Sequence, residues 1–117
     1  MKKLIVCLIA LGAFAFSSHA QSSPGTVTIK GEVLDMACYL DHGAQGEKHA
    51  ACAAKCIRSG LPVGIKAEDG QVYLLIGQHK PINDQLADFA GKTITVQGKL
   101  ANRDGINLLE NASIVTE

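Results

Sequence analysis

Residues 82–100 read Ile-Asn-Asp-Gln-Leu-Ala-Asp-Phe-Ala-Gly-Lys-Thr-Ile-Thr-Val-Gln-Gly-Lys-Leu and contain a helix pattern followed directly by a strand pattern. In the first half, large apolar residues recur every three or four positions, which is typical of one buried helix face, and Gly91 follows as a stop signal. In the second half, apolar and polar residues alternate, which is typical of a strand. We therefore predict a helix over 82–90 and a strand over 92–100.

Four further segments carry strand patterns rich in β-branched residues, at 26–34, 63–66, 71–76 and 106–115. The second and third of these are separated by Glu68-Asp69-Gly70, a hairpin turn signal. Five short strands with a helix between the third and the fourth is the order of an OB-type barrel. The predicted fold is therefore mainly β, a small OB-like five-stranded barrel.

An insertion at about 35–60 separates the first strand from the second. Its first part, 35–46, breaks the alternation and contains two glycines, so we predict a loop there. Its second part, 47–59, is rich in alanine and lacks Gly and Pro, and Gly60 and Pro62 follow it. This pattern predicts a helix that ends before Gly60. A minimal barrel does not need this helix.

The chain begins with the pattern of a secretory signal. Lys2 and Lys3 precede an apolar run over 4–16, and Ser18-His19-Ala20 offers small residues for cleavage. The run of 13 residues is shorter than the ~20 that a membrane-spanning helix needs, so we expect no stable membrane anchor. The sequence thus predicts a cleavable signal at 1–20, a linker at 21–25, and a single domain at 26–117 in a bacterial periplasm or outside the cell.

The composition of the remaining domain excludes several classes of protein. Loss of Lys2 and Lys3 leaves nine basic and eleven acidic residues, and a net charge near −2 does not favour nucleic-acid binding. The sequence contains no Trp, which also argues against a face that stacks bases. No nucleophile elbow, phosphate loop or Ser/His/Asp pattern is present. We therefore expect a protein that is not an enzyme, and the sequence does not indicate a protein partner.

Cysteine and histidine residues gather in the insertion. Cleavage of the signal removes Cys7, and the remaining cysteines share the insertion with two histidines: Cys38, His42, His49, Cys52 and Cys56. On a regular helix the last three of these fall within an arc of about 60°. Three thiolates and one imidazole suit tetrahedral Zn²⁺, and thiolates also suit Cu⁺. The spacing predicts a soft-metal site with a structural or metal-handling role.

The spacing indicates the histidine ligand less directly than it indicates the three cysteine ligands. His49 and Cys56 are seven residues apart, about 10.5 Å along a regular helix, so one ion reaches both only where the first turn is irregular. His42 is the alternative fourth ligand. Asp35 and Asp41 flank Cys38 in sequence and are candidates to orient a histidine ligand by hydrogen bonding.

A disulfide is the main alternative to a metal. In an oxidising compartment, Cys38 paired with Cys52 or Cys56 would tie the insertion to the barrel. The protein would then be a disulfide-stapled binding or interaction module without metal. Either pairing leaves one thiol over, and an odd cysteine in an exported protein also suits a third class, a thiol-redox protein.

The sequence resembles a group of small secreted bacterial proteins whose function is not established. The residues that carry the resemblance are Gly31-x-Val33-x-Asp35-x-x-Cys38, then His49-x-x-Cys52-x-x-x-Cys56, then a closing strand at 91–98 that begins Gly-Lys. The resemblance implies an OB-like core and a cluster of Asp35, Cys38, His49, Cys52 and Cys56. Since His42 is outside that motif, the resemblance favours His49 as the histidine ligand. It implies no activity.

Overall fold

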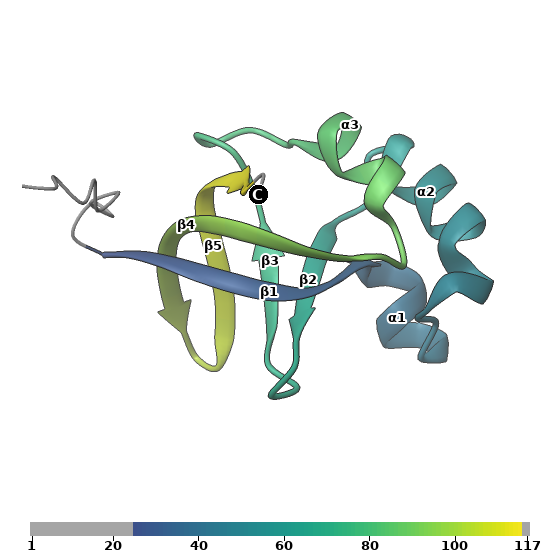
Figure 1. The fold of residues 1–117 in the computed structure, drawn as a ribbon, viewed down its shortest axis with the longest axis horizontal. Coiled ribbons are helices and arrows are strands. Elements are labelled where there is room, and N and C mark those ends of the chain that lie inside the picture. The colour runs from purple at the N-terminus through teal and green to yellow at the C-terminus, as the bar shows by residue number, and fades with distance from the viewer. Residues whose placement is uncertain (1–24, 116–117) are drawn as a thin grey trace, which may run out of the picture.

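The five strands form one closed barrel in a computed structural model that describes residues 25–115 (Figure 1). Around the barrel the strands follow the order β1-β2-β3-β5-β4. Their bounds are β1 Thr26–Asp35, β2 Val63–Ala67, β3 Val72–Leu75, β4 Thr93–Arg103 and β5 Ile106–Ile114. Neighbouring strands are antiparallel except β3 and β5, which pair in parallel. The predicted mainly β, five-stranded OB-like barrel is confirmed. The predicted signal at 1–20 and most of the linker lie outside the described residues.

Strand β1 closes the barrel because it pairs with β4 along its first part and with β2 along its second part. Gly31 lies where these two ladders overlap, opposite both Ala67 and Ile94. A Cβ atom at Gly31 would lie 2.2 Å from the carbonyl oxygen of Lys66. Only glycine permits this close approach of two backbones, which explains the glycine of the first motif.

The barrel interior and one end are filled by a continuous apolar core. Helix α3, Asn83–Leu86, and the 3₁₀ turn Ala87–Phe89 lie between β3 and β4, where the sequence predicts a helix. Their apolar side chains pack on the barrel, as the periodicity predicts. The buried core comprises Val33, Ile57, Val63, Ile65, Leu75, Ile82, Leu86, Ala87, Ala90, Val96, Leu109 and Ala112.

The insertion between β1 and β2 consists of two helices, α1 Met36–His42 and α2 Ala50–Arg58, which lie together at one end of the barrel (Figure 1). The helix predicted over 47–59 is present as a 3₁₀ turn, Glu47–His49, followed by α2. The loop predicted over 35–46 is wrong for its first half, because α1 lies there. Both ends of this short helix carry ordinary caps, an aspartate before it and a left-handed glycine after it.

Candidate metal centre

Three cysteines from the two inserted helices converge on one point. Cys38 comes from α1, and Cys52 and Cys56 lie one turn apart on α2. Their Sγ atoms all lie within 4.8 Å of one another, and all three residues are free thiols. Four Zn–S bonds of about 2.3 Å in a tetrahedron separate the sulfurs by about 3.8 Å. The cluster therefore needs a contraction of about 1 Å or less, which side-chain rotation can supply.

Cys38 is held in place by the residues that begin α1. Asp35 is buried and caps the helix, since its carboxylate oxygens accept the backbone N–H groups of Ala37 at 3.3 Å and Cys38 at 3.1 Å. The N–H of Met36 donates to the carbonyl of Pro62 at 2.9 Å, and the Met36 side chain is buried. The first turn of α1 is therefore anchored to the strand end and to the chain that enters β2.

Helix α2 is anchored independently at its carboxyl end. The side chain of Ile57 is 0 % exposed and belongs to the barrel core. The side-chain amide of Asn83 donates two hydrogen bonds of 2.8 Å, one to the carbonyl of Ile57 and one to that of Leu61. An exposed ion pair between Arg58 of α2 and Asp88 of the 3₁₀ turn that follows α3 adds a second link to the same region. These contacts fix the helix face that carries Cys52 and Cys56.

The start of α2 is held against the barrel at Gly91. This glycine has a φ of +72°, and a Cβ atom there would lie 2.8 Å from the carbonyl oxygen of Gly46 and 3.0 Å from the Cβ of Ala50. The N–H of Gly46 also donates to the carboxylate of Glu32. The chain that enters α2 therefore packs closely on Gly91, just before β4, and is hydrogen-bonded to β1, without a covalent link.

The two predicted histidines lie beside the thiols but outside the group of atoms within 4.8 Å. His42 and His49 are exposed and line a cavity of about 350 Å³, together with Asp35, Cys38, Ala44, Cys52 and Ala53. The Nε2 atom of His42 lies 2.9 Å from the Oδ2 atom of Asp41. His49 lies in the 3₁₀ turn, so the irregular first turn is present. A 3₁₀ turn rises more per residue than an α-helix, however, and this places His49 farther from Cys56.

The carboxylate of Asp35 raises the pKa of two of the thiols, those of Cys38 and Cys56. It raises the pKa of Cys38 to about 12, first by accepting a hydrogen bond from the thiol, with desolvation and its negative charge adding to the effect. The pKa of Cys56 is also raised, first by desolvation and then by the charge of Asp35. Both thiols therefore hold their protons at neutral pH, and a metal ion must displace these protons to bind.

Sequence reasoning missed helix α1 and the small residues that leave the cavity open. The signal for α1 was available in Asp35, a favoured N-cap, followed by seven residues without Gly or Pro and then by Gly43. The alanines Ala44 and Ala53 line the cavity and carry no bulk that would fill it. An alanine-rich helix next to cysteines is therefore a signal of accessible thiols.

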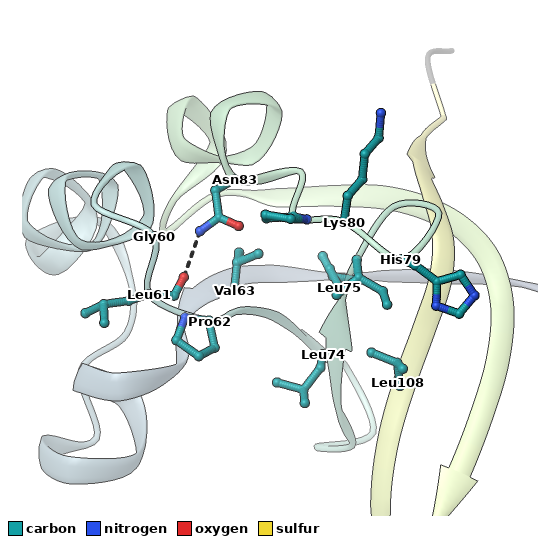
Figure 2. Close-up of a pocket in the computed structure, with 12 residues that line it drawn as sticks. Gly60, Leu61, Pro62, Val63, Leu74, Leu75, His79, Lys80, Asn83 and Leu108 are labelled. Atoms are coloured by element: carbon teal, nitrogen blue, oxygen red, sulfur yellow. Dashed lines mark hydrogen bonds between the residues drawn. The ribbon is translucent and has the colours of Figure 1, made fainter.

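A second concavity, of about 450 Å³, lies where the chain before β2 faces β3 and β5 (Figure 2). Most of its lining is apolar: Leu61, Pro62, Val63, Leu74, Leu75, Ile76, Pro81 and Leu108. Figure 2 shows the Lys80 side chain extending away from these leucines, and Asn83 directing its amide nitrogen to the carbonyl of Leu61. The groove thus offers an apolar surface and lacks converging charged groups among its described residues.

Together, the fold and the cluster define a small five-stranded closed β-barrel protein with a three-cysteine site on a helical insertion. Comparison with models of known protein families, with curated proteins and with solved structures finds no match. No helix within residues 25–115 is long and apolar enough to cross a membrane.

Proposed function

We propose that this chain is an exported domain that binds one soft transition-metal ion, Zn²⁺ or Cu⁺, through the thiolates of Cys38, Cys52 and Cys56. The observation that carries the proposal is the mutual approach of the three Sγ atoms to within 4.8 Å from two separate helices. Thiolates are the preferred ligands of both ions, and a shift of about 1 Å brings the sulfurs to coordination spacing. The proposed role is metal binding without catalysis.

The proposed fourth ligand is His49. His49 lines the cavity that Cys38 and Cys52 also line, and in this proposal its imidazole turns toward the thiols when the ion binds. His42 lines the same cavity and is the alternative, but its Nε2 atom is already engaged by Asp41. Asp35 orients the Cys38 backbone, and Asp41 orients His42.

Export is part of the proposal because it determines the redox state that the thiols meet. The charged start, the apolar run at 4–16 and the small residues before Gln21 support cleavage of 1–20. In an oxidising compartment, a disulfide between Cys38 and Cys52 or Cys56 competes with metal binding, and the approach within 4.8 Å also suits this second candidate. A bound ion protects thiolates from that oxidation.

One experiment separates the two candidates. The mature protein is purified from the periplasm without reducing agent, and its intact mass and metal content are measured. Metal binding predicts three reduced thiols and one equivalent of metal per chain. Export with cleavage of the signal predicts an amino terminus at Gln21. A mass lower by two hydrogens with no metal would instead establish the disulfide-stapled module.

The ligand set is tested by substitution. Cys52→Ser is expected to lower the metal content and the melting temperature of the metal-saturated protein together, because the stabilisation by a bound ion rises with the logarithm of its affinity. Ala51→Ser is the matched control, since Ala51 lies on the same helix and is exposed. Unchanged metal content in Cys52→Ser would remove Cys52 from the set. The pair His49→Ala and His79→Ala tests the fourth ligand in the same way.

A further inference from the structure

The insertion is attached to the barrel by contacts that involve no cysteine. Ile57 is buried in the core, and the amide of Asn83 donates to one carbonyl in the last turn of α2 and to one just after it. Gly91 packs closely against the start of that helix. Helix α1 is attached through Met36 and the Asp35 cap. In small domains that depend on a structural metal, the ion holds together elements that do not fold without it. Here both helices are attached by other contacts, so the cluster is organised before any ion binds.

The cluster is also open on one side. Cys52 is exposed, and Cys38 and Cys56 are partly exposed. The cavity of about 350 Å³ adjoins Cys38 and Cys52, and its histidine walls are exposed side chains. Structural zinc sites are closed by four protein ligands, whereas zinc sites that bind an outside molecule keep a position open to it. The described residues place three ligand atoms together, and two of these cysteines line this cavity together with His42 and His49.

We infer that the ion is a cargo, which enters and leaves through this cavity by exchange with a thiolate group of a donor or acceptor molecule. The inference rests on the proposed function and specifies its role as metal handling. Its basis is the combination of a preorganised three-thiol cluster with a fourth ligand, His49, on the wall of an accessible cavity. The partner is defined by its chemistry as a thiol-bearing molecule, because a soft ion held by thiolates passes most readily to another thiolate.

The exchange requires no oxidant or reductant. An incoming thiol loses its proton to water as its sulfur forms a bond to the ion, and the neutral imidazole of His49 leaves the ion. The bond between the ion and Cys52, the most exposed of the three cysteines, then breaks, and the Cys52 thiolate takes a proton from water. Two further incoming thiols each lose a proton to water as they bind the ion, and the thiolates of Cys38 and Cys56 leave and take protons from water. The charge of the ion does not change.

The test measures how fast the zinc-loaded mature protein releases its ion. N-acetylcysteine is added at increasing concentrations, and a chromogenic zinc chelator at fixed concentration reports the released ion. We expect the release rate to rise in direct proportion to the N-acetylcysteine concentration, whereas citrate at the same concentrations leaves it unchanged. His49→Ala is expected to raise the rate several-fold, and His79→Ala, on a distant loop, is expected to match the wild type.

A second measurement tests whether the ion is also a staple. Hydrogen exchange of the α2 backbone amides is compared between the zinc-loaded protein and the same protein after removal of zinc. Retained protection without zinc supports a cargo, and loss of protection confined to α1 and α2 overturns it. A release rate that does not depend on thiol concentration also overturns exchange. A protein that takes up no stoichiometric metal overturns the proposed function itself, which distinguishes the two failures.

Discussion

The buried carboxylate of Asp35 accepts the backbone N–H of Cys38 at 3.1 Å, and its hydrogen bonding to the thiol of the same residue is the main cause that raises the pKa of Cys38. One side chain therefore both begins helix α1 and sets the protonation of a candidate metal ligand. Its exposed fraction of 2 % strengthens these interactions because water does not compete with them. The fold of the insertion and the chemistry of the cluster are coupled at this residue.

Asp35→Asn separates these two roles. Asparagine caps helices as well as aspartate does, so α1 is retained, but the negative charge is lost. The pKa of Cys38 should then fall from about 12 toward the ordinary 9.0. At about pH 9 the metal-free variant should react with iodoacetamide at Cys38 at least about tenfold faster than the wild type. Peptide mass mapping measures the rate, and Cys52 in the same sample is the internal control. Equal rates at Cys38 would contradict the electrostatic role of Asp35.

Metal affinity should weaken as the pH falls. A raised thiol pKa favours the neutral thiol at every pH below it, so Cys38 and Cys56 carry protons that the ion must displace. Each displaced proton weakens the apparent affinity about tenfold per unit of pH, and the loss continues from about pH 8 to about pH 6. Competition titrations with a zinc chelator at several pH values measure this slope. Cys38→Ser should reduce the slope by one proton, and a flat profile would rule out thiolate ligands.

Ile57→Ala should destabilise the whole domain, because the buried side chain of Ile57 anchors helix α2 to the barrel core. Removing a fully buried isoleucine side chain costs about 2–5 kcal/mol in the free energy of unfolding. Leu40→Ala is the control, since Leu40 lies on α1 with 75 % of its surface exposed and should change stability by about 0.5 kcal/mol or less. Urea unfolding measures both values. Similar small losses in the two variants would show that α2 is not anchored through the core.

Gly91→Ala should displace the start of α2. The new Cβ would lie within 3.0 Å of both the Gly46 carbonyl and Ala50, and a left-handed φ adds about 1–3 kcal/mol of strain. Gly105→Ala is the matched control, because Gly105 has a φ of +82° and nothing within 4 Å of the added atom. Thermal unfolding should show a larger fall in melting temperature for Gly91→Ala than for Gly105→Ala, and the difference measures the contribution of the close packing. Equal losses would mean that only backbone strain is involved.

The barrel was predictable from local patterns. Alternation identifies the strands, and the helical spacing at 82–90 places a helix between the third and fourth strands, an order that few β folds share. The α1 segment was not predicted, because 36–42 is short and because the residues that cap it, Asp35 and Gly43, are also typical of turns. Short helices depend on tertiary contacts more than on propensity.

The sequence by itself determined that Cys52 and Cys56 share one face of a helix, because side chains four residues apart on an α-helix lie one turn apart on the same face. It also placed all candidate ligands in one insertion. Only the tertiary structure decided that the Cys38 thiol meets the other two within 4.8 Å while the histidines lie on the cavity wall. That meeting depends on where α1 and α2 each lie on the barrel, which is set by the hydrogen bond of Met36 to Pro62 and by the packing of Ile57 in the core. Such contacts join residues far apart in the chain, so no local spacing encodes them.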